Sequence, residues 1–121
     1  MSKLGGGPGG PLSIASMPPI VISGLYNAML VTTLNVVDVA APIPSSALAD
    51  RNSITITNLS ATDTIYISSS PLVTADRVVG TTSGHEIGPL ESFNINITDA
   101  IILYAISESG KTILTKVMEV A

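Results

Sequence analysis

Residues 53–68 read SITITNLSATDTIYIS, and this stretch decides the predicted fold. Ile54 and Ile56 alternate with threonines, and Ile65 and Ile67 flank a tyrosine. Apolar residues at every second position are typical of a strand with one buried face. The residues LSATD between the two runs are turn formers. The pattern therefore predicts two strands joined as a β-hairpin by this five-residue loop.

Further strands are predicted on both sides of this segment. Phe93, Ile95 and Ile97 alternate with asparagines, and residues 101–106 (IILYAI) are apolar on both faces, which favours a central strand or a subunit contact. Ile, Val and Thr make up 37 of the 121 residues, and these β-branched residues favour strands. We therefore predict an all-β fold, a small antiparallel β-sandwich of about seven strands. Its predicted core is Ile54, Ile56, Ile65, Ile67, Phe93, Ile95, Ile97, Leu103 or Tyr104, and Val117.

The first thirty residues differ in composition from the rest. They hold six of the ten glycines, four of the eight prolines and a single charged residue, Lys3. We divide the chain into a flexible to extended N-terminal arm, residues 1–30, and a β-sandwich domain, residues 31–121. Residues 17–30 (MPPIVISGLYNAML) are too apolar to stay solvated, so they should pack on their own domain or on a neighbour. The predicted partner or subunit interface is Ile20, Val21, Ile22, Leu25, Tyr26, Met29, Leu30, Ile101 and Leu103.

Composition excludes several classes of function. Charged residues make up 12% of the chain, the net charge is −4, and cysteine and tryptophan are absent. We expect no disulfide or cysteine-bound metal, no nucleic-acid partner and no membrane span. We expect synthesis in the cytoplasm, because the N-terminus lacks the pattern of a secretory signal. An apolar chain of this size with few charges favours a homo-oligomer, above all a trimer.

No motif in the sequence predicts catalysis or a cofactor. His85 and Glu86 are neighbours, and neighbours on a strand point to opposite faces, so we interpret His85 as a solvated loop residue rather than a metal ligand. The sequons at Asn58 and Asn96 are interpreted as chance matches. Arg51 precedes the first quoted strand, where it either pairs with Asp50 or a C-terminal carboxylate or faces solvent.

The order of motifs resembles the small β-sandwich modules of tailed-bacteriophage virion proteins. The matching segments are 42–48 (PIPSSAL), 51–60 (RNSITITNLS), 64–68 (TIYIS), 87–97 (IGPLESFNINI), 103–107 (LYAIS) and 115–121 (TKVMEVA). The chain departs from the family pattern at Ser68-Ser69 and at Pro89-Leu90-Glu91. The resemblance implies a non-enzymatic virion protein that decorates or stabilises the capsid or joins virion parts. Its partners would then be capsid, portal, neck or fibre subunits. The alternative is a receptor- or glycan-binding fibre module on the same fold.

Overall fold

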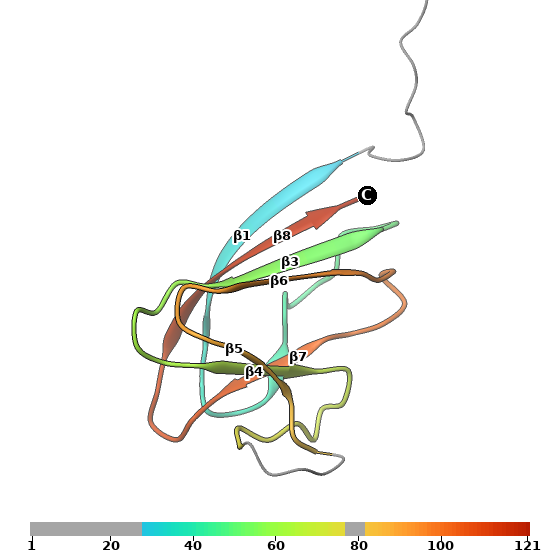
Figure 1. Cartoon of the computed structure of the whole chain (residues 1–121). Helices are drawn as coiled ribbons and strands as arrows, with labels where there is room; N and C mark the ends of the chain where they lie inside the picture. Colours follow the sequence, from blue (N-terminus) through green and yellow to red (C-terminus); the bar gives the residue numbers. More distant parts are fainter. Residues whose placement is uncertain (1–27, 77–81) are drawn as a thin grey trace, which may run out of the picture.

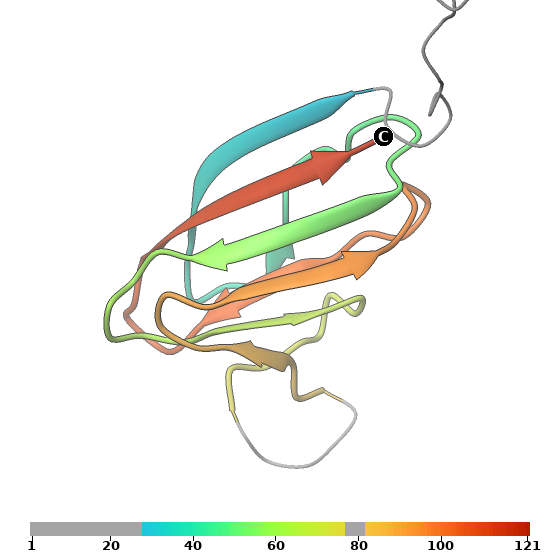
Figure 2. The same ribbon diagram turned by 45° about the horizontal axis from the view of Figure 1, so that its top comes forward.

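The computed structural model describes residues 28–76 and 82–121, which form two antiparallel four-stranded sheets packed face to face (Figures 1 and 2). The described residues contain no helix. The eight strands are β1 (Met29–Val36), β2 (Ala41–Pro42), β3 (Ser53–Asn58), β4 (Ile65–Ser68), β5 (His85–Ile87), β6 (Ser92–Asn96), β7 (Tyr104–Ser107) and β8 (Ile113–Val120). The predicted all-β sandwich is thereby confirmed. Two short strands, β2 and β5, were not predicted. The sequence also favours a short strand at residues 77–80, and these residues lie outside the described part of the chain.

The strand order is that of a jelly roll. One sheet runs β1-β8-β3-β6 and the other β2-β7-β4-β5, an eight-stranded double-sheet arrangement. Four connections cross between the sheets where β1 and β3 end and β6 and β8 begin, and we name this the crossover end. The opposite end, which we name the terminal end, carries residues 43–52, residues 97–103, Ala28 and Ala121.

The predicted hairpin is wrong. β3 pairs with β8 and β6, whereas β4 pairs with β7 and β5, so the two strands lie in different sheets. The residues between them cross the sandwich instead of reversing the chain within one sheet. Each strand still turns its isoleucines inward, as the alternation predicted, and Ile54, Ile56, Ile65 and Ile67 are all buried.

The core lies between the two sheets and has the predicted composition in most positions. Leu103 and Val117 are buried, together with Val36, Ile43 and Ile113. The three alternating residues of the β6 region are only partly buried and pack against the core from its rim. Because β6 is the last strand of its sheet, no neighbouring strand among the described residues covers their outer side. These three residues are Phe93, Ile95 and Ile97.

The first strand begins two residues before the predicted boundary at residue 31. β1 starts at Met29, and Ala28 and Ala121 exchange two backbone hydrogen bonds of 3.0 and 2.8 Å just before it. Met29 and Leu30, which the sequence analysis placed in the arm, therefore belong to the first strand. Residues 101–106 are divided: Ile101 and Ile102 are exposed, and β7 runs centrally in its sheet from Tyr104, as an apolar segment of this kind predicted.

Candidate interaction surfaces

Arg51 joins two loops of the terminal end from a fully buried position. It follows the loop that leads into β3, and only 2% of its surface is exposed. Its guanidinium donates to Glu119 of β8 at 2.8 Å and to the carbonyl oxygens of Thr98 and Ile101, also at 2.8 Å each. Nε adds a 3.3 Å bond to the carbonyl of Ile97. Of the alternatives for Arg51, a carboxylate in the C-terminal strand is the one observed.

Glu119 completes this cluster. Its carboxylate is 1% exposed and also accepts the backbone N–H of Leu48 at 3.0 Å. Asp99 on the facing loop accepts the N–H of Asp50 at 3.1 Å. The two loops are therefore tied together by charge-assisted bonds to backbone groups, which are stronger than neutral ones.

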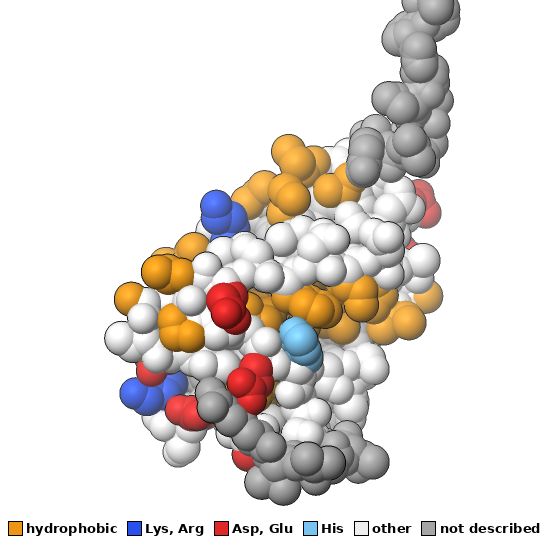
Figure 3. Space-filling view, viewed as in Figure 1, with side chains coloured by type: hydrophobic (Ala, Val, Ile, Leu, Met, Phe, Trp, Pro, Cys, Tyr) orange, Lys and Arg blue, Asp and Glu red, His pale blue; other side chains and the backbone are white. Residues whose placement is uncertain are grey.

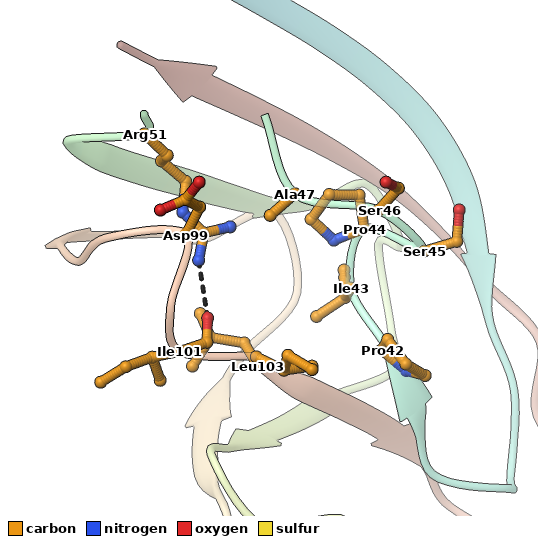
Figure 4. A pocket seen from close by; sticks show the side chains of 11 residues that line it. Pro42, Ile43, Pro44, Ser45, Ser46, Ala47, Arg51, Asp99, Ile101 and Leu103 are labelled. Carbon is orange, nitrogen blue, oxygen red and sulfur yellow. Dashed lines mark hydrogen bonds between the residues drawn. The ribbon is translucent and has the colours of Figure 1, made fainter. Parts of the chain in front are cut away.

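A hollow of about 320 Å³ opens beside this cluster (Figure 4). It is lined by Pro42, Ile43, Pro44, Ser45, Ser46, Ala47, Arg51, Asp99, Ile101, Ile102 and Leu103. Figure 4 shows the guanidinium of Arg51 directed at the carbonyl of Ile101, not into open space. The charged side chains that line this hollow, Arg51 and Asp99, bind the backbone of the facing loops. Their bonds therefore fix the shape of the hollow.

A second hollow, of about 280 Å³, lies along the open side between β5 and β6. The rings of His85 and Phe93 lie across it with centroids 4.5 Å apart. Its lining is mostly apolar and consists of Ile67, Ser68, Ser69, His85, Phe93, Ile95, Ile97, Ile101 and Leu103. Figure 3 shows apolar side chains gathered beside the histidine. We name this hollow the β5–β6 groove.

The third surface is strand β1, which forms the edge opposite β6 in the sheet β1-β8-β3-β6. Met29 and Val31 are exposed, and so is Leu114 on the neighbouring strand β8. Leu30 is 45% exposed although its register partner, Glu119, is buried. Figure 3 shows apolar side chains over this strand. A chain of 12% charged residues thus presents an apolar strand at a sheet edge.

The predicted interface residues are divided among these surfaces. Met29, Leu30 and Ile101 are exposed. Leu103 is 6% exposed and belongs to the core, so its assignment to an interface is corrected. It lies one residue before β7, and its side chain points into the core. Because residues 101–106 are apolar on both faces, the sequence could not show which of their side chains point inward. The remaining five predicted residues, Ile20, Val21, Ile22, Leu25 and Tyr26, lie outside the described residues.

His85 begins β5 rather than lying in a loop, and it is exposed as predicted. By register it shares the face of Ile67, whereas Glu86 shares that of Tyr66, so the two neighbours do point apart. Within residues 28–76 and 82–121, no three His, Cys, Asp or Glu side chains are grouped as a metal site would require. Likewise, no helix of the described part of the chain is long and apolar enough to cross a membrane.

The two sequon asparagines have different surroundings. Asn58 is completely buried, and its amide donates to the carbonyls of Asp63 and Ile87 at 2.7 and 3.0 Å. Asn96 is exposed on β6. The folded domain therefore withholds the first asparagine from modification, in line with its interpretation as a chance match.

The chain matches no protein-family model, and no curated protein matches it. The sequence analysis allowed Arg51 a C-terminal carboxylate as its partner but did not identify that carboxylate as Glu119. The signal was present in residues 115–121, because the alternation of Thr115, Val117 and Glu119 places the carboxylate on the inward face. The open side of the sandwich at β5 and β6 had no such signal, since it depends on which strands end each sheet.

Proposed function

We propose that the protein is a non-enzymatic structural component of a bacteriophage virion, which decorates or stabilises the capsid or joins virion parts. The observation that carries the proposal is the jelly-roll strand order in a chain whose motifs resemble virion modules. Jelly rolls serve in viral capsid domains, and also in lectins and cupins. Because one fold serves many functions, the fold supports the proposal only together with the motifs.

The use of the buried polar residues supports a scaffold role. Arg51 and Glu119 tie loops at the terminal end, and Asn58 ties connections at the crossover end. These side chains are committed to the backbone rather than converging on a hollow as a reacting constellation would. What the domain offers a partner is apolar surface, at β1 and in the β5–β6 groove. We infer partners among capsid, portal, neck or fibre subunits, with further copies of the chain.

The proposal is tested on virions from an infected culture of the phage that encodes this sequence. We expect the chain to sediment with purified particles at a fixed copy number, measured by quantitative mass spectrometry. Particles made without the gene should lose stability to heat or fail to complete assembly, and the full chain supplied in trans should restore them. A chain found only in the soluble lysate, with normal particles in its absence, would contradict a structural role.

A receptor- or glycan-binding module is the second candidate, and the His85–Phe93 ring pair in the β5–β6 groove favours it. Rings at the mouth of a hollow can stack on the apolar face of a sugar. On this alternative, Phe93→Ala virions should assemble normally but adsorb to cells at least tenfold more slowly. Asn96→Ala, on the outward face of the same edge strand, is the matched control. Equal adsorption of both variants would remove this candidate.

A further inference from the structure

Among the residues that the structure describes, strand β1 is an edge strand without the usual protection. It ends its sheet in the order β1-β8-β3-β6 and reads MLVTTLNV over eight residues. Natural edge strands are commonly guarded by charged side chains, prolines or short length, because an open edge pairs readily with another strand. β1 has no charged residue and no proline. The other edge of this sheet, β6, is shorter and turns Ser92, Asn94 and Asn96 outward.

The hydrogen bonds at Ala28 identify which backbone groups face the open edge. Ala28 and Ala121 exchange both of their bonds, so they form a hydrogen-bonded pair of the β1–β8 ladder. The direction of the backbone groups alternates along an antiparallel strand, so the even-numbered residues of β1 also face β8. The odd-numbered residues turn their N–H and C=O groups toward the open edge, and these are Met29, Val31, Thr33 and Asn35.

We propose that β1 is an interface between two copies of this chain, which pair antiparallel through these edges into one continuous eight-stranded sheet. The inference goes beyond the proposed virion role and does not depend on it. A second copy fits because the strand is uncharged, so two identical edges meet without like-charge repulsion. Its edge-facing groups also form a run that is symmetric about Thr32. A two-fold contact of this kind matches one surface to itself.

One register uses every edge-facing group. With the two-fold axis at Thr32, Val31 lies opposite Thr33 of the second copy, and Met29 lies opposite its Asn35. Each such pair exchanges two hydrogen bonds. If the axis passes through Val31 instead, Asn35 of each copy has no β1 residue opposite it. If it passes through Thr33, the same holds for Met29. A one-residue shift would turn the buried face of one copy to the solvent face of the other.

The side chains support the same register. It places Leu30 opposite Leu34 of the second copy, on the inward face of both sandwiches. Leu30 is 45% exposed in the single chain and would be covered there by an apolar neighbour. Ala28 of one copy comes beside Val36 of the other. A two-fold contact makes pairs of chains, whereas the sequence analysis favoured a trimer.

A cysteine at position 32 tests the register, because the chain has no cysteine of its own. In the proposed register, Thr32 of one copy lies opposite Thr32 of the second copy in a non-hydrogen-bonded pair. The Cα atoms of such a pair lie about 4.5 Å apart, a distance at which two cysteines can form a disulfide. We expect Thr32→Cys to form covalent dimers on mild oxidation of the full chain. The matched control is Thr33→Cys. The Cα atoms of the two residues at position 33 lie diagonally across the interface, about 8 Å apart, so these cysteines should not form a disulfide. Equal crosslinking of both variants, or of neither, overturns the proposal.

A charge placed on the edge provides an independent test that forms no bond at position 32. In sedimentation equilibrium we expect the wild-type chain at twice its 12.4 kDa mass and Thr33→Lys at 12.4 kDa. Asn96→Lys adds the same charge to the opposite edge of the sheet and should remain a dimer. A wild-type chain that is monomeric at high concentration overturns the proposal. So does an oligomer that Thr33→Lys leaves intact.

Discussion

Arg51 and Glu119 are the only oppositely charged pair among the described residues with both side chains fully buried, so each depends on the other to offset its loss of water. Removing two charges from water is costly, and only their mutual attraction and further hydrogen bonds offset that cost. Here Arg51 has three backbone carbonyls besides Glu119, and Glu119 has the N–H of Leu48. The exposed pair of Lys111 and Asp63, at 3.4 Å, has no such environment.

Glu119→Leu should therefore lower the free energy of unfolding by about 3–5 kcal/mol, because it leaves Arg51 charged and unpaired in the interior. Urea denaturation followed by circular dichroism measures the change. Lys111→Ala, which breaks the exposed pair, should cost less than about 1 kcal/mol. Adding Arg51→Met to Glu119→Leu should recover part of the loss, since the buried charge is then gone. Equal effects of Glu119→Leu and Lys111→Ala would show that the buried pair contributes nothing special.

At the scale of elements, the crossover end is held by side chains that join one connection to another. Asn58 ends β3, accepts the N–H of Ser60 at 2.8 Å and donates to Ile87, the last residue of β5. Its backbone N–H donates to Glu91, just before β6. Between the other two crossovers, the carboxylate of Asp38 accepts the N–H of Gly110 at 2.8 Å. The four crossovers are thus linked in two pairs.

Asn58→Ala should lower the free energy of unfolding by about 2–3 kcal/mol. The change leaves buried partners of the amide without a hydrogen bond, and each unpaired group lowers the stability by about 1–3 kcal/mol. Thermal unfolding by calorimetry is the measurement. Asn96→Ala, at the exposed sequon asparagine, is the matched control and should change stability by no more than about 0.5 kcal/mol. If the two alanine variants melt together, the bonds of Asn58 do not stabilise the crossover end.

At the scale of the whole molecule, the described residues already form a continuous core between two sheets. Residues from both sheets meet there, including Ile56 and Val117 from one and Ile65 and Ala105 from the other. The first strand needs Ala28, whose bonds to Ala121 close the β1–β8 ladder. A truncation that tests the N-terminal segment must therefore stop at residue 27 and leave Ala28 in place.

Deletion of residues 1–27 should leave a chain that folds cooperatively, with an unfolding free energy within about 1 kcal/mol of the full chain, because the core and the β1–β8 ladder are retained. Chemical denaturation and the dispersion of amide NMR signals measure this. If the segment is an attachment element, the truncated chain should also fail to incorporate into particles. Unfolding of the truncated chain would instead assign the segment to the core of its own domain.

Alternation along the chain was enough to predict the fold class and the buried face of β3 and β4. Side chains alternate with a period of two in any strand, so Ile54 and Ile56 had to share a face whichever strands lay beside them. The same rule, applied to residues 115–121, would have placed Glu119 inside. The change in local composition near residue 30 likewise lies within two residues of the observed start of β1.

Only the tertiary structure decided which strands are neighbours. A loop of five or six residues can reverse the chain within a sheet or cross the roughly 10 Å between sheets, and its sequence is compatible with both. The connection that crosses the sandwich after Asn58 is stabilised by hydrogen bonds from Asn58 to Ile87 and Glu91, which lie about thirty positions away in the sequence. The backbone acceptors of Arg51 lie 46 to 50 positions away, and Glu119 lies 68 positions away. Such contacts leave no local pattern, so the open edges of the two sheets, where the proposed interactions occur, follow only from the assembled fold.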